Sequence, residues 1–138
     1  MTLPKLAALY GLTLVAFLAI DVVWLFTATP RLYRPALSGL LAEKPVLSAA
    51  AVFYMLYVIG VVALAVIPRV QAGSLTEALW RGALFGFLAY ATYDLTNLAT
   101  LRDWPLTITL IDLVWGTVLT SLTTLAGYYA AIWLKIVG

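Results

Sequence analysis

Four long apolar stretches dominate this 138-residue sequence and leave few folds open to it. A helix that crosses a bilayer needs roughly 20 mostly apolar residues. Each stretch meets that length, and together they leave little chain for a soluble domain. They cover residues 6–26, 46–67, 80–101 and 106–133. The sequence therefore predicts an all-α integral membrane protein, a four-helix transmembrane bundle forming a single domain over residues 1–138.

Composition supports this prediction and removes several kinds of chemistry. Hydrophobic residues make up 64% of the chain and the mean hydropathy is +1.05, whereas soluble domains are about 45–50% apolar. The chain has no Cys and no His. Disulfides, thiolate nucleophiles and iron–sulfur sites are therefore excluded, as are imidazole bases and ordinary haem ligation. The first stretch is too long and too interrupted for a cleaved signal peptide, so we expect it to be retained.

Local signals mark the ends of the predicted helices. All six prolines lie at or outside the edges of the apolar stretches, where we expect helices to end. The segment "GSLTE" is a capping box, in which Ser74 accepts from the backbone of Glu77 and the Glu77 side chain reaches back. Between the first two spans, residues 27–45 have either a short helix lying in the membrane interface or an irregular loop. Lys and Arg are tied, four on each side of the membrane, so orientation stays open.

Three of the six acidic residues lie inside the apolar stretches, where a charge is costly and usually faces protein or water. At about 1.5 Å per helical residue, Asp21 lies about 8 Å from the end of its span, Asp94 about 10 Å and Asp112 about 9 Å. All three ends are on the same side of the membrane. The carboxyls are therefore predicted to share one layer, either as a polar pocket or as three separate structural hydrogen-bond centres.

Polar and aromatic side chains gather at the same depth. Tyr90, Asp94 and Asn97 share one helix face, with Tyr93 beside it. The other aromatic residues of this layer are Trp24, Tyr54, Tyr57, Trp104 and Trp115. For Trp104, at the edge of its span, an interfacial belt is the favoured interpretation. Gly82 and Gly86 form a small-xxx-small pair that permits close helix packing.

Two short motifs repeat an aspartate followed by a tryptophan. They are "AIDVVWLF", residues 19–26, and "LIDLVWGT", residues 110–117. The first and fourth spans run in opposite directions, so internal duplication does not explain the match. The same topology puts Trp24 on one side of the acidic layer and Trp115 on the other. It predicts an acidic pocket bracketed by two indoles.

Four segments of the chain resemble a bacterial family of four-span inner-membrane proteins, catalogued as domain of unknown function family 2177. They are "FYMLYVIG" (53–60), "GALFGFLAYATYDLTNLATL" (82–101), "WPLTITLIDLVWGT" (104–117) and Asp21-x-x-Trp24. The resemblance implies a multi-pass protein of the bacterial inner membrane. It brings no assigned activity with it.

Three functions fit the sequence. The favoured one is binding or transport of a small cationic or amphipathic molecule in the acidic, aromatic-lined pocket. The predicted ligand-binding residues are Asp21, Trp24, Tyr54, Tyr57, Tyr90, Tyr93, Asp94, Asn97, Asp112 and Trp115. The alternatives are an accessory subunit that packs against another membrane protein through the Gly82/Gly86 face, and a small lipid-modifying enzyme. No catalytic residue, metal, cofactor or nucleic acid is expected; the expected partners are the lipid bilayer, a small ligand, and a second copy or another membrane protein.

Overall fold

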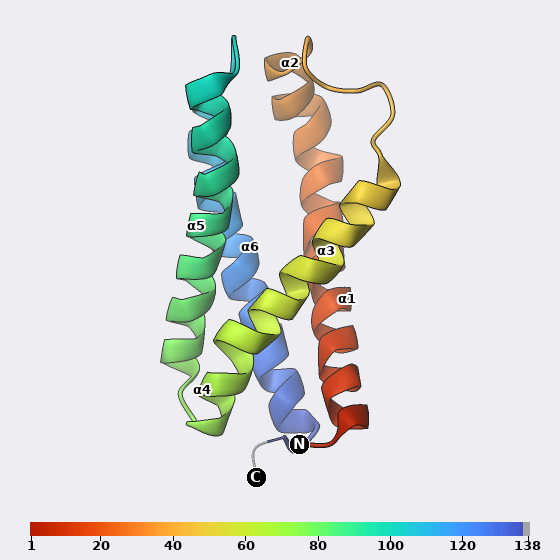
Figure 1. Cartoon of the computed structure of the whole chain (residues 1–138), viewed down its shortest axis with the longest axis vertical. Helices are drawn as coiled ribbons and strands as arrows, with labels where there is room; N and C mark the ends of the chain where they lie inside the picture. Colours follow the sequence, from red (N-terminus) through yellow and green to blue (C-terminus); the bar gives the residue numbers. More distant parts are fainter. Residues whose placement is uncertain (137–138) are drawn as a thin grey trace.

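The computed structural model describes residues 1–136, and all of its regular secondary structure is helical. The elements are α1 (Leu3–Ala28), η1 (Thr29–Tyr33), α2 (Arg34–Ala36), α3 (Leu47–Val61), η2 (Val62–Val66), α4 (Ile67–Gln71), α5 (Leu75–Thr100) and α6 (Leu106–Trp133). Consecutive elements join into four rods: α1–η1–α2, α3–η2–α4, α5 and α6 (Figure 1). The prediction of an all-α four-helix bundle is confirmed.

The second rod lies at an angle to the other three (Figure 1). The rods α1, α5 and α6 stand roughly upright, and α3 crosses in front of them from α1 toward α5. As a result η2 and α4 contact α5 and α6, while α3 contacts mainly α1. Both termini and the turn between α4 and α5 lie at one end of the bundle, called end A here. The α2 segment and the turn between α5 and α6 lie at the opposite end, called end B.

Glycines bring α5 and α6 together along the most extensive helix contact of the bundle. Gly82 and Gly86 are buried, and a Cβ on either would collide with Thr120 or Thr124 of α6. Small residues of this kind let helix backbones approach closely in membrane proteins. The Gly82/Gly86 face is thus used inside the chain, so it no longer favours an accessory subunit that needs this face for another protein.

The outer surface of the bundle is apolar. Phe26 is 81% exposed, Leu3 78% and Val114 66%. An exposed apolar surface of this extent is unfavourable in water but suits contact with lipid. Three rods are long and apolar enough to cross a membrane: Leu3–Ala36, Leu47–Gln71 and Leu106–Trp133. The fourth rod, α5, has 26 residues, as many as α1. It is less apolar than the other rods because it carries the buried Asp94 and several threonines.

The expectation that helices end at the prolines is wrong for Pro30, Pro35 and Pro68. Pro30 lies within the π-helical segment η1, Pro35 lies in α2, and Pro68 follows the π-helical segment η2. A proline removes one N–H donor and crowds the carbonyl four residues earlier, and a π-helical turn accommodates this without ending the helix. At Pro68 the freed carbonyl of Leu64 instead accepts from the Arg81 guanidinium at 3.0 Å.

The segment between the first two rods is neither a separate interfacial helix nor an irregular loop along its whole length. Helix continues from α1 through Ala36 without a break, and residues 37–46 have no regular helix. The short helix exists, therefore, but as an extension of α1 rather than as a separate one. At end A, Ser74 caps α5 by accepting from the Glu77 backbone at 3.3 Å, as predicted. The Glu77 side chain does not reach back, because it pairs with Arg69.

Candidate functional site

The three intramembrane aspartates are all buried, and they come from three different helices. Asp21 lies on α1 and is 6% exposed, Asp94 on α5 is 0% exposed, and Asp112 on α6 is 6% exposed. The hydrogen-bond partners of the three carboxyls differ.

Both carboxylate oxygens of Asp21 have a hydrogen-bond donor. Tyr54 of α3 donates its hydroxyl to Oδ2 at 2.9 Å, and Trp115 of α6 donates its indole N–H to Oδ1 at 3.4 Å. Asp21 therefore ties together α1, α3 and α6. Its hydrogen bond with Tyr54 joins the tilted α3 to α1.

A chain of aromatic contacts leads from Asp21 to Asp112. The rings of Trp115 and Trp24 are stacked, with centroids 4.4 Å apart and planes 10° from parallel. Trp24 donates its indole N–H to the Tyr33 hydroxyl at 3.2 Å, and Tyr33 in turn donates to Oδ1 of Asp112. The prediction of two indoles on opposite sides of an acidic pocket is therefore wrong, because the antiparallel helices α1 and α6 bring the indoles face to face.

Asp94 is the one carboxyl of the three without a hydrogen bond. It lies within interaction range of the Asp112 carboxyl, yet neither of its oxygens has a hydrogen-bond partner among residues 1–136. No basic side chain compensates for it there: the only ion pair in the described residues is that of Arg69 with Glu77, at end A. A buried charge without a partner is costly, and no hydrogen bond or ion pair among the described residues stabilises an ionised Asp94.

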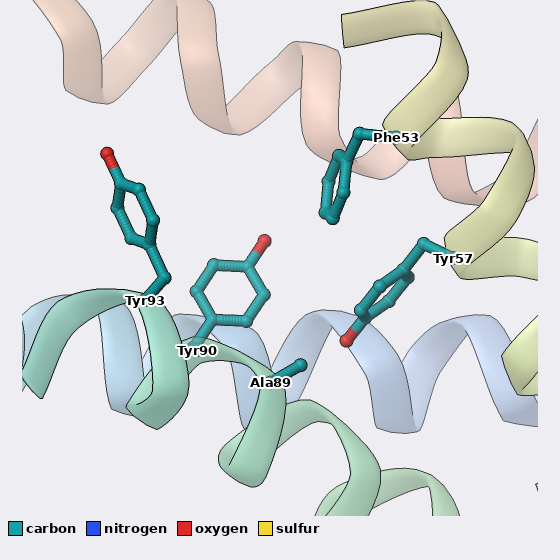
Figure 2. Close-up of a pocket in the computed structure, with 5 residues that line it drawn as sticks. All are labelled: Phe53, Tyr57, Ala89, Tyr90 and Tyr93. Atoms are coloured by element: carbon teal, nitrogen blue, oxygen red, sulfur yellow. The ribbon is translucent and has the colours of Figure 1, made fainter. Parts of the chain in front are cut away.

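A pocket opens between α3 and α5, where the tilt of α3 moves it away from α5. Its volume is about 280 Å³, and it is lined by Phe53, Tyr57, Ala89, Tyr90 and Tyr93 (Figure 2). Tyr57 is buried and its hydroxyl shares a hydrogen bond with Thr120 at 2.7 Å. The side chains of Tyr90 and Tyr93 both extend away from the α5 ribbon in Figure 2, and their hydroxyls diverge from each other. The walls are therefore aromatic rings, and the carboxyls lie outside the lining.

The ring of Tyr90 joins the pocket to the acidic residues. On one side it lines the pocket, and on the other it packs so closely on Gly116 of α6 that a Cβ there would collide with it. Asp94 follows Tyr90 by one helical turn on α5, and Gly116 follows Asp112 by one turn on α6. The pocket and the Asp94–Asp112 pair are thus adjacent regions that share helix α5.

Comparison with known proteins assigns the chain to a family. Residues 6–129 match the family model described as "Predicted membrane protein (DUF2177)". The chain belongs to the DUF2177 family. No curated protein and no solved structure matches it. This DUF2177 chain is accordingly a multi-pass membrane protein, and its matched region contains every residue of the pocket and of the acidic network.

The structure divides the predicted binding residues of this DUF2177 protein into two groups. Tyr57, Tyr90 and Tyr93 line the pocket. The residues of the buried network are Asp21, Trp24, Tyr54, Asp94, Asp112 and Trp115. Asn97 is half-buried on α5, one helical turn after Tyr93, and is not among the residues that line the pocket.

Sequence reasoning missed Tyr33, Phe53 and Ala89. Tyr33 is brought to Asp112 only because helix continues beyond Pro30, although its helical spacing with Leu37 was a usable signal. Phe53 and Ala89 carry no polar group that would single them out. Trp104 is also corrected: it is 9% exposed and donates to Thr109 at 3.0 Å, so it is part of the packed end of the bundle and not an exposed belt residue.

Asp94 and Asp112 are within interaction range of each other. The acidic residues of the network do not form a metal-binding cluster. Among residues 1–136 no group of three or more His, Cys, Asp or Glu side chains could hold a metal ion. Asp21 is engaged by Tyr54 and Trp115. The arrangement is suited to attracting positive charge and to holding protons.

Proposed function

We propose that this DUF2177 protein binds or transports a small cationic or amphipathic molecule in the pocket between α3 and α5. One observation carries the proposal: an aromatic-walled pocket lies beside buried carboxyls that have no basic partner among residues 1–136. We also propose the bacterial inner membrane as the location, on the basis of the resemblance described above.

Charge is the first argument for a cationic ligand. Asp21, Asp94 and Asp112 are buried within the apolar bundle, and a carboxylate in such surroundings gains from an added positive charge. Aromatic ring faces attract cations as well, by about 0.5–2 kcal/mol for each well-placed ring. Four aromatic residues line this pocket. Walls and neighbouring carboxyls therefore favour the same sign of charge.

Size and access are the second argument. The volume of about 280 Å³ is near the lower end of the roughly 300–1,000 Å³ of typical ligand pockets, so the ligand is small. Phe53 is 46% exposed and Tyr93 58%, and both lie on helices whose outer faces are apolar. A molecule with an apolar part could reach the pocket sideways from the lipid, between α3 and α5.

The test uses benzyltrimethylammonium as the probe and neopentylbenzene as its neutral isostere. The two have the same shape, and only the first is charged. Equilibrium dialysis of each labelled compound against purified protein in a maltoside detergent measures the two dissociation constants. We expect saturable binding of the cation, at least about 10-fold tighter than the isostere, which corresponds to about 1.4 kcal/mol.

Variants separate the site from non-specific uptake by the micelle. The double substitution Asp94→Asn with Asp112→Asn removes the charge of the pair and should weaken cation binding about 10-fold or more. Tyr90→Leu removes one aromatic wall and should weaken it several-fold. Asp103→Asn is the matched control, because Asp103 is an exposed carboxylate at end B. Equal binding of the cation and the isostere, or equal binding by wild type and the double variant, would contradict the proposal.

A further inference from the structure

The hydrogen bonds around Tyr33 fix where its single hydroxyl hydrogen points. An indole N–H can only donate, so in the contact between Trp24 and Tyr33 the Tyr33 oxygen is the acceptor. The Tyr33 hydrogen is then free for its second neighbour, Oδ1 of Asp112. That oxygen of Asp112 must therefore accept, and it carries no hydrogen of its own.

Asp94 faces this acceptor without any donor of its own. Both Asp94 oxygens lack a hydrogen-bond partner in the described part of the chain, and the Asp112 carboxyl is within interaction range of Asp94. Two ionised carboxylates offer only acceptors to each other, and they repel. A single hydrogen between them would turn this repulsion into a hydrogen bond, as in other pairs of carboxyls that share a site.

We propose that Asp94 and Asp112 form a proton-binding site that holds one proton, carried by Asp94, which donates it to the ionised Asp112. Asp112 is the charged member because it already accepts a hydrogen bond from Tyr33. Asp94 is the neutral member because it has no donor to stabilise a charge. The pair then carries one negative charge in place of two.

Asp21 provides an internal comparison. Its two oxygens accept from Tyr54 and Trp115, so both are satisfied when the group is ionised and no shared proton is needed. The other ionisable groups close enough to interact with the pair are Tyr33, Tyr90 and Tyr93. No Lys or Arg of residues 1–136 forms an ion pair with either carboxyl.

Infrared spectroscopy tests the proposal without any ligand. A protonated carboxylic acid has a carbonyl stretching band separate from the bands of amides and ionised carboxylates, and this band shifts when the exchangeable hydrogen is replaced by deuterium. A maltoside detergent has no ester carbonyl to mask it. We expect this band in wild-type protein at neutral pH, with loss of the band in Asp94→Asn and its retention in Asp21→Asn. Absence of the band from wild-type protein would overturn the proposal, and so would its survival in Asp94→Asn.

A second variant keeps the test sharp if Asp94→Asn does not fold. Tyr33→Phe removes the donor to Asp112, which changes the acceptor of the shared proton, so the wild-type band should shift in frequency. Tyr10→Phe is the matched control, since the Tyr10 hydroxyl donates to the Met55 carbonyl on another part of the bundle. A band that is unchanged in Tyr33→Phe would contradict the shared proton. Because no ligand is used, this outcome is independent of the benzyltrimethylammonium measurement.

Discussion

The packing of α5 on α6 makes a strong prediction for the substitution Gly86→Ala. A Cβ on Gly86 would lie 2.6 Å from the Cβ of Thr120 and would also collide with the backbone carbonyl of Gly116. A side chain can rotate away, but a backbone carbonyl in a helix cannot, so the two helices must separate. Overpacking of a tight interior typically costs about 1–3 kcal/mol. We expect the free energy of unfolding to fall by about that amount.

The matched control is Gly11→Ala on α1. No atom lies within 4 Å of a Cβ placed on Gly11, and alanine favours a helix interior over glycine by about 0.5–1 kcal/mol. The assay is unfolding by sodium dodecyl sulfate in mixed micelles, followed by circular dichroism. Gly86→Ala should unfold at a lower detergent fraction than wild type and Gly11→Ala at an equal or higher one. Equal stability of wild type and Gly86→Ala would refute the close approach of α5 to α6.

Three further substitutions test individual contacts by the same unfolding assay. Tyr54→Phe removes a hydrogen bond to the buried carboxylate of Asp21, so we expect a loss of about 1.5–3 kcal/mol, and no loss would mean that this contact is not formed. Arg81→Ala leaves the Leu64 carbonyl without its guanidinium donor, which should cost about 0.5–1.5 kcal/mol; an unchanged midpoint would count against that bond. Glu77→Gln breaks an exposed ion pair, for which we expect a loss below about 1 kcal/mol that diminishes further in high salt; a larger, salt-independent loss would contradict it.

The fold class was predictable because it depends on apolar stretches long enough to cross a bilayer, and these can be counted in any sequence. The cap at Ser74 was predictable for a similar reason, since a capping box is local. The continuation of helix through Pro30 and Pro68 was not, because it depends on π-helical turns and on a tertiary bond from Arg81. The local preferences of proline cannot indicate a distant partner such as Arg81, whose guanidinium donates to the Leu64 carbonyl.

The candidate site was predictable in its membership more than in its arrangement. Depth along each helix identified the three aspartates, since burial of a carboxylate in an apolar stretch is rare and visible in the sequence. The stacking of Trp24 on Trp115 depends on how α1 and α6 are rotated about their axes. Counting residues along a span estimates the depth of a side chain in the membrane but not the rotation of its helix. The pocket depends on the tilt of α3, and its residue Phe53 has no polar atom to reveal it.

The position of a bound cation tests the central claim most directly. A density map of the protein with benzyltrimethylammonium, compared with a map of the protein alone, asks where the probe lies. The account predicts added density between α3 and α5, bounded by Phe53, Tyr57, Tyr90 and Tyr93, and loss of that density in the variant with both Asp94→Asn and Asp112→Asn. An unchanged pocket at saturating probe, or density elsewhere on the bundle, would contradict it.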